Sequence, residues 1–228
     1  MRTLVIAPEA PGLPPLAMWQ EISQIGDIEG VELTVCGGRA ATRSRVAAQL
    51  RNPWELAIWS GHGQPGSLMA ADGLISAEWL ACQLRQAPPA LAVVSACFSV
   101  ARDAALGAIT TAISQAGINV VGMWLAVEDR AAIVYDVELA RAMASGSGVA
   151  VAHRVAVDQV ALEYPKMAGC MYLTPGLVNG YRQIAQRMDG IEDRLGQVET
   201  VIATRMAGVE QKLDLLTSLF RRDGGWET

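Results

Sequence analysis

Two stretches of the sequence decide its fold: ELAIWSGHG at residues 55–63 and LAVVSACFS at residues 91–99. Each begins with a short apolar run, which is typical of a strand buried on both faces of a sheet. Each run then ends in small and polar residues. In a parallel sheet the carboxyl ends of neighbouring strands meet at one edge, where ligands bind. The sequence therefore places His62 and Cys97 where such a sheet carries its chemistry.

Strand-like and helix-like stretches alternate along the rest of the first 178 residues. Further strands are predicted at residues 3–7, 31–36, 119–124 and 170–173. Helices are predicted at residues 15–25, 42–51, 76–85, 101–116, 129–144 and 149–163. Asp72-Gly73 is typical of a tight hairpin turn. This alternation predicts an α/β fold, a three-layer sandwich in which helices cover both faces of a mostly parallel sheet.

Composition excludes several classes of protein. The chain has 228 residues, 51% of them hydrophobic, and a formal net charge of −5. It is too apolar for intrinsic disorder and too acidic for a basic nucleic-acid-binding surface. Its longest apolar run, residues 120–127, falls far short of the roughly 20 residues of a membrane-spanning helix. The apolar stretch near the N-terminus is too short for a secretory signal, so we expect a cytoplasmic protein that binds neither nucleic acid nor membrane.

Residues 179–228 differ in kind from residues 1–178, which we expect to form the single folded domain. From Ile184 onward, apolar residues recur at alternating steps of four and three, which gives two sets of positions, each with a seven-residue spacing. One set is Ile184, Ile191, Val198, Arg205, Lys212 and Leu219, in which Arg205 and Lys212 are polar, and the other is Met188, Leu195, Ile202, Val209 and Leu216. This pattern predicts a long C-terminal helix that forms a coiled coil through residues 184–220, either in a homo-oligomer or with a partner protein. A helix folded back on the core is the alternative.

The cysteines and histidines do not form a metal site. They are Cys36, Cys82, Cys97, Cys170, His62 and His153. Their spacing fits neither zinc ligation nor a disulfide framework, and the absence of nucleotide-binding motifs predicts that the protein uses no cofactor. We expect Cys36, Cys82 and Cys170 to be small buried apolar residues and His153 to lie at the edge of the core or on the surface.

Cys97 differs from the other cysteines because it ends a strand and precedes the helix predicted from residue 101. A helix N-terminus stabilises a thiolate, and a neighbouring imidazole does so further. His62, set between two glycines after the preceding strand, is the candidate for that imidazole. Together they would make an activated nucleophile and its base.

The residues around this pair resemble a known family. SGHG at residues 60–63 and VVSAC at residues 93–97 resemble the His-Gly and Ser-Ala-Cys blocks of the CHAT family, caspase-like cysteine peptidases related to separase. DGLI at residues 72–75 and GMWLAVED at residues 122–129 extend the resemblance, which covers roughly residues 56–160. It implies a caspase-like fold.

The same resemblance implies a cysteine endopeptidase that acts on a protein substrate. His62 would be the general acid and base, Cys97 the nucleophile that forms a thioester, and the backbone N–H groups of Gly63 and Cys97 the oxyanion hole. Many related peptidases cleave after basic residues, for which Asp103 or Asp129 could supply a carboxylate. The surroundings of Cys97 lack the Gln-Ala-Cys-x-Gly sequence of caspases, which argues against aspartate specificity.

Family members often act as signal-activated effectors in bacterial cell death and antiviral defence, and the resemblance implies such a role here. Two alternatives stay open. The chain could be a catalytically silent caspase-like scaffold that oligomerises through its C-terminal helix. It could also be a small-molecule α/β enzyme in which the cysteine and histidine meet by coincidence.

Overall fold

The structure is a computed structural model that describes residues 1–10, 12–13, 16–97, 109–124 and 126–177. The predicted C-terminal coiled coil, residues 179–228, and most of the loop that follows Cys97 lie outside the described residues.

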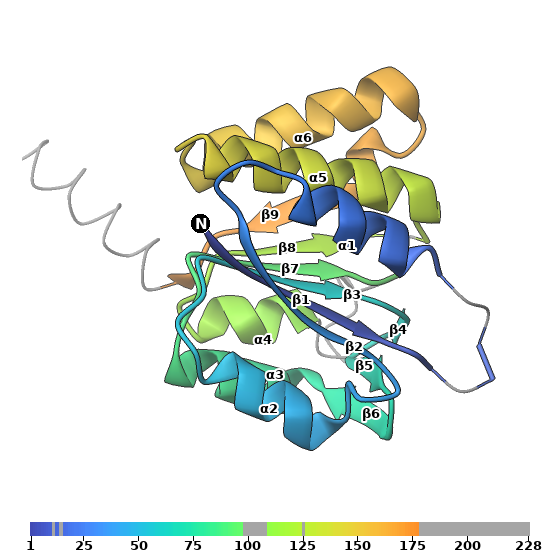
Figure 1. The fold of residues 1–228 in the computed structure, drawn as a ribbon, viewed down its shortest axis with the longest axis vertical. Helices are drawn as coiled ribbons and strands as arrows, with labels where there is room; N and C mark the ends of the chain where they lie inside the picture. Colours follow the sequence, from blue (N-terminus) through green and yellow to red (C-terminus); the bar gives the residue numbers. More distant parts are fainter. Residues whose placement is uncertain (11, 14–15, 98–108, 125, 178–228) are drawn as a thin grey trace, which may run out of the picture. The chain divides into compact units, whose positions relative to one another are not determined.

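A six-stranded sheet forms the centre of the folded domain, in the order β2-β1-β3-β7-β8-β9 (Figure 1). Its strands are β1 (Arg2–Pro8), β2 (Glu32–Gly38), β3 (Leu56–Ser60), β7 (Leu91–Ser95), β8 (Val120–Met123) and β9 (Met171–Thr174). The first five strands are parallel, and β9 runs antiparallel to β8. The prediction of a mostly parallel sheet is confirmed.

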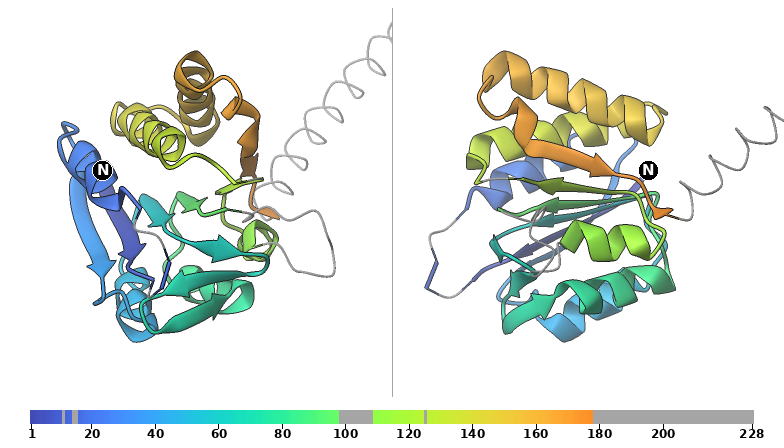
Figure 2. Two further views of the ribbon diagram at one scale, coloured as in Figure 1. Left: turned by 90° about the vertical axis from the view of Figure 1, so that its right-hand side faces the viewer. Right: turned by 180° about the vertical axis from the view of Figure 1, so that it is seen from behind.

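Helices cover both faces of this sheet (Figures 1 and 2). On one face lie α1 (Met18–Gly26), α5 (Asp129–Ala144) and α6 (Val149–Glu163), and on the other α2 (Arg43–Leu50), α3 (Ala77–Gln86) and α4 (Ile109–Gln115). A short 3-10 turn, η1 (Ala168–Cys170), leads into β9. The structure confirms the predicted bounds of α5 and α6. The expected start of the helix at residue 101 lies outside the described residues.

A three-stranded antiparallel sheet lies beside the carboxyl end of β3. It consists of β4 (Gly63–Gln64), β5 (Ser67–Ala70) and β6 (Gly73–Ser76). The hairpin was predicted, but its turn is displaced by one residue. Ala70 pairs with Gly73, so Ala71 and Asp72 make the turn and Gly73 begins β6. The strand β4 was not predicted because two residues carry no periodic signal.

The side chains of the central strands alternate between two cores. In β3 and β7, Ile58 and Val93 belong to the core under α1 and α5, whereas Trp59 and Val94 belong to the core over α3 and α4. Because successive side chains in a strand point to opposite faces, the last residues, Ser60 and Ser95, face α1 and α5. Both serines are buried.

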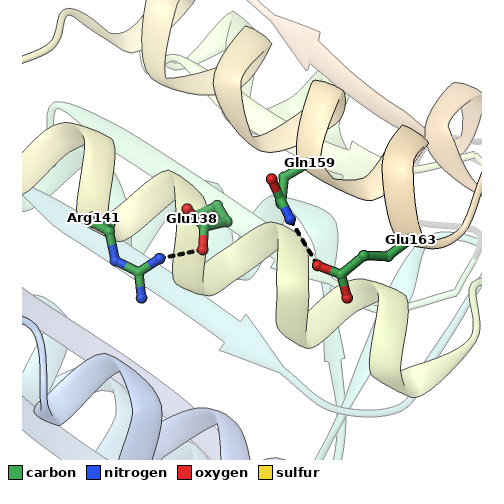
Figure 3. A network of polar contacts seen from close by, with 4 residues as sticks. All are labelled: Glu138, Arg141, Gln159 and Glu163. Carbon is green, nitrogen blue, oxygen red and sulfur yellow. Dashed lines mark hydrogen bonds and ion pairs between the residues drawn. The ribbon is translucent and has the colours of Figure 1, made fainter.

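The outer surfaces of α5 and α6 carry polar contacts within each helix. Figure 3 shows an ion pair between Arg141 and Glu138 on α5 and a hydrogen bond on α6 in which Gln159 Nε2 donates to Glu163 Oε1 at 2.8 Å. Such exposed contacts at i,i+3 or i,i+4 spacing contribute about 0.2–0.5 kcal/mol each. None of the helices in the described part of the chain is long and apolar enough to cross a membrane.

Candidate active site

His62 lies two residues beyond the end of β3, at the carboxyl edge of the parallel sheet. The backbone amide of Gly61 donates to the Ser95 carbonyl at 3.2 Å, which ties this turn to the end of β7. The His62 carbonyl accepts a hydrogen bond from the Met69 amide at 3.0 Å. Both neighbours of His62 are therefore fixed to strands, while its own side chain is only half-buried.

Cys97 lies two residues beyond the end of β7, the strand next to β3. Ser60 and Ser95 are partners in the parallel register of these strands, so both strands end at the same level of the sheet. The structure thus brings His62 and Cys97 to one edge, as the sequence predicted. Cys97 is half-buried, whereas Cys36 and Cys170 are buried.

Gly63 packs directly against the end of β7. A Cβ atom at this position would lie 2.9 Å from Ala96 Cβ and 3.2 Å from the Cys97 carbonyl oxygen, closer than side chains tolerate. The glycine after His62 is therefore what allows the β3 turn to approach the cysteine. It leaves no room for a side chain between the backbone of Gly63 and the end of β7.

The ladder between β4 and β5 sets the direction of the Gly63 amide. His62 and Met69 form a hydrogen-bonded pair, and Gly63 pairs with Leu68 one residue further on. In an antiparallel ladder hydrogen-bonded and non-hydrogen-bonded pairs alternate. The N–H of Gly63 therefore points away from β5, toward the open edge of this small sheet.

A pocket of about 650 Å³ lies beside His62. It is lined by Pro8, Glu9, Ala10, Gly12, Leu13, Leu16, Met18, Trp19, Gly38, Arg39 and His62, most of which follow β1 or β2. Glu9 and Arg39 form an exposed ion pair with Nε and Oε2 3.5 Å apart. The sequence analysis missed this pocket, although the proline-rich stretch after the first predicted strand falls at the same edge of the sheet.

Four buried polar side chains lie beneath the two strand ends. Ser60 Oγ donates to Glu21 Oε2 at 2.5 Å, and Ser95 Oγ donates to Asp136 Oδ2. Glu21 and Asp136 are 2% and 0% exposed. The sequence analysis did not identify this cluster. The sequence did contain a signal for it: Ser60 and Ser95 are polar residues two positions after Ile58 and Val93, and they therefore lie on the same buried face of the sheet.

Burial controls the protonation of both acids. It raises the pKa of Glu21 to about 7, because the charged form is poorly solvated there, although a hydrogen bond from Ser60 lowers it in part. Burial also raises the pKa of Asp136 well above its ordinary value, and the neighbouring Glu21 charge raises it further. Both acids are therefore harder to ionise than ordinary carboxyl groups.

Of the two aspartates predicted to bind substrate, the structure describes only Asp129. Asp103 lies outside the described residues. Asp129 is in the first turn of α5, where its Oδ2 accepts a hydrogen bond from the Ala17 amide at 2.6 Å. The carboxylate thus holds the N-terminus of α1, a role that follows from the positive end of the helix dipole.

The structure agrees with the predictions for the remaining cysteines and for His153, except at Cys82. Burial raises the pKa of the Cys36 thiol, which keeps it protonated and unreactive. Cys82 is exposed, so the prediction that it is buried was wrong. On α3 the inward face is formed by Ala77, Leu80, Ala81 and Leu84, and the 3.6-residue period turns position 82 toward solvent. His153 is half-buried, with Nδ1 2.6 Å from the Tyr135 hydroxyl oxygen.

The described residues contain no group of three or more metal-ligating side chains placed to bind an ion. What the strand ends do offer is a thiol, an imidazole and a backbone amide that points away from β5. This is the set of groups that nucleophilic acyl transfer needs.

This architecture is the caspase-like α/β fold, which is shared with cysteine peptidases. In particular, the chain is similar to the crystal structure of gingipain R, an Arg-specific cysteine proteinase, with a TM-score of 0.52 and 10% sequence identity. The match covers 77% of this chain and 46% of the gingipain chain, so it spans less than half of that protein. At this identity the likeness shows the fold. No family model and no curated protein matches the sequence.

Proposed function

We propose that the protein is a cysteine endopeptidase in which Cys97 is the nucleophile and His62 the general acid and base. The observation that carries this proposal is the register of β3 and β7. Ser60 and Ser95 are paired, and each is followed two residues later by a member of the dyad. The sequence blocks around both residues favour the CHAT family within the caspase-like class.

The reaction follows from the chemistry of these groups. The Cys97 thiolate attacks the substrate carbonyl carbon, and His62 gives a proton to the departing amine, which leaves a thioester. His62 then takes a proton from water, whose oxygen attacks the thioester and releases Cys97. The N–H groups of Gly63 and Cys97 stabilise the oxyanion in both steps. One such donor contributes about 3 kcal/mol to the transition state.

The pocket beside His62 is the proposed site for a substrate side chain. Among the described lining residues the apolar wall comes from Leu13, Leu16, Met18 and Trp19, and the acid is Glu9. Since Asp129 already holds the Ala17 amide, Glu9 is a better placed partner for a basic side chain than Asp129 is. Such a side chain would compete with Arg39 for the Glu9 carboxylate.

The test is substitution of each member of the dyad by alanine. Cys97→Ala and His62→Ala should each abolish cleavage of a protein or peptide library while thermal unfolding stays that of the wild type. Cys82→Ser is the matched control, because it removes an exposed thiol from α3 without touching the strand ends. A full cleavage rate in either dyad variant would contradict the proposal.

A signal-activated role in bacterial cell death or antiviral defence is part of this proposal and rests on the family resemblance alone. Oligomerisation or partner binding through residues 184–220 would then connect the signal to the catalytic domain. A catalytically silent scaffold makes the opposite prediction for labelling. An acyloxymethyl-ketone probe should label Cys97 of an active enzyme faster than Cys82, and equal labelling would favour the scaffold.

A further inference from the structure

The buried cluster beneath the strand ends has a specific connectivity. Glu21 comes from α1 and Asp136 from α5, and each acid is bonded to the serine that ends one of the two central strands. Ser60 and Ser95 are also partners in the β3–β7 register. Helix α1 therefore holds the end of β3, just before His62, and α5 holds the end of β7, just before Cys97.

The two carboxyl groups are close enough to influence each other's pKa. Glu21 Oε1 and Asp136 Oδ1 are both buried and have no hydrogen-bond partner. A single proton held between the two acids would satisfy both of these oxygens, while the serine hydroxyls satisfy Oε2 and Oδ2. The singly protonated pair is thus the state in which all four oxygens are bonded, which matters because an unbonded buried polar atom is costly.

No positively charged group in the described part of the chain contributes to the pKa of either acid. From the start of α5 the Asp129 carboxylate acts on Glu21 and raises its pKa slightly further. Tyr135 lies beside Asp136 on α5 and is bonded to His153 of α6. The flanking strands β1 and β8 present Ala7 and Met123 to this face of the sheet. A second negative charge at the pair would therefore be strongly disfavoured.

We infer that Glu21 and Asp136 are positioning residues, whose shared proton and serine contacts hold the ends of β3 and β7 in the arrangement that aligns His62 with Cys97. This inference rests on the proposed function. It assigns the acids no contact with substrate, because they are buried and act through Ser60 and Ser95.

The protonation of the pair then affects the alignment of the dyad. A second proton on the pair would be carried by Glu21 Oε2 or Asp136 Oδ2, the atoms that now accept hydrogen bonds from the serines. The serine at that atom would then have to give up its hydrogen bond. Because Glu21 takes up this proton near pH 7, alignment should weaken as the pH falls through that value. A glutamine at position 21 keeps an acceptor for Ser60 and supplies a fixed donor to Asp136, so its alignment should not depend on this proton.

The experiment compares the alkylation rate of Cys97 by iodoacetamide between pH 5.5 and 8.5 in the full chain. All proteins carry Cys82→Ser, which removes the exposed competing thiol. The test variant is Glu21→Gln. The matched control is Glu138→Gln, which removes a carboxylate from α5 two residues from Asp136 and breaks only the surface ion pair with Arg141 (Figure 3). Rates are expressed as the ratio of variant to wild type, because a pH effect common to both proteins then cancels.

The ratio for Glu21→Gln should be near one above pH 8 and rise at least threefold below pH 6, with a midpoint near 7. For Glu138→Gln it should stay near one throughout. Asp136→Asn, which also replaces a proton by a fixed donor, should resemble Glu21→Gln. A ratio that does not change with pH, or the same change in Glu138→Gln, overturns the inference.

A second measurement keeps this outcome separate from that of the proposed function. Infrared difference spectra between wild type and Glu21→Gln report the carboxylic acid band of Glu21 whether or not the protein cleaves peptides. If the infrared band titrates near pH 7 while the alkylation ratio stays constant, the positioning role is overturned. A pH-dependent ratio in a protein that cleaves no peptide supports the positioning role and contradicts the peptidase assignment.

Discussion

At the scale of single residues, Gly63 shows why the type of residue after His62 matters. Its backbone lies against Ala96 and Cys97 at a distance that leaves no room for a side chain. The same residue is proposed to donate to the oxyanion. Both properties come from the missing Cβ, which lets the β4 backbone approach the end of β7.

Gly63→Ala tests this close approach. The added methyl would meet Ala96 Cβ at 2.9 Å and the Cys97 carbonyl at 3.2 Å, so the His62 turn must move away from Cys97. We expect cleavage to fall at least tenfold, equivalent to about 1.4 kcal/mol in the activation barrier, with a smaller effect on thermal stability. Kinetics and thermal unfolding measure the two effects.

Gly169→Ala is the matched control for this prediction. Gly169 is exposed in η1, and an added Cβ meets nothing within 4 Å. Cleavage should stay at the wild-type rate in this variant. Wild-type activity in Gly63→Ala would show that the strand ends can separate without harm to the dyad.

Single residues also show the limits of sequence patterns. His62 was selected by its place after an apolar run and between two glycines, and Cys97 by its place between a strand and the helix predicted from residue 101. Glu21 and Asp136 were overlooked because an acid within a helix is usually solvated. Only the packing of α1 and α5 on the sheet shows that both acids point inward, where Ser60 and Ser95 meet them.

At the scale of elements, α1 and α5 are joined to the sheet by both apolar and polar contacts. Ile25 of α1 and Leu139 of α5 belong to the same apolar core as Ile58 of β3. The acids lie in that core, so their ionisation has to be linked to folding. This linkage can be measured without any knowledge of the substrate.

The stability of the domain should decrease as the pH rises from about 4.5 to 7. The pKa of Glu21 is higher in the folded protein, about 7, than its ordinary value of 4.5, so the folded state binds more protons than the unfolded state within this window. Stability therefore falls with pH there, by up to ~3 kcal/mol from Glu21 alone. Urea unfolding at a series of pH values measures the change.

Two variants test the origin of this pH dependence. Glu21→Gln should flatten the decline between pH 4.5 and 7, because the amide does not titrate. Glu163→Gln, on the outer surface of α6, should leave the decline as in the wild type (Figure 3). An unchanged slope in Glu21→Gln would mean that other groups cause it.

At the scale of the whole molecule, the domain and the C-terminal sequence have separate tasks in the proposed function. The domain carries the dyad, and residues 184–220 carry the seven-residue apolar pattern. The described residues that line the pocket beside His62 and the two buried acids all lie between residues 8 and 136. Assembly and chemistry should therefore be separable by mutation.

Leu195→Asp with Ile202→Asp should dissociate the oligomer in sedimentation experiments, because both residues lie in the predicted apolar seam. Gln197→Asp, outside the seam, should leave assembly unchanged. Labelling of Cys97 by a small probe should be similar in all three proteins. Oligomers that persist in the double variant would contradict the coiled-coil prediction.

The sequence by itself predicted the alternation of strands and helices, the mostly parallel sheet and the two residues at its edge, although it missed the short strand β4. It could do so because apolar periodicity and chain breaks are local properties. Cys36 and Cys170 were also placed correctly, whereas Cys82 was not, since the orientation of a short helix depends on what it packs against.

Tertiary structure alone decided which distant residues meet. The register of Ser60 with Ser95, the contact of Gly63 with Cys97 and the pocket between the ends of β1 and β2 join segments far apart in the chain. The pairing of Glu21 with Asp136 joins two helices on one face of the sheet. Such contacts depend on the packing of whole elements, and the periodicity of a single segment carries no information about its neighbours in space.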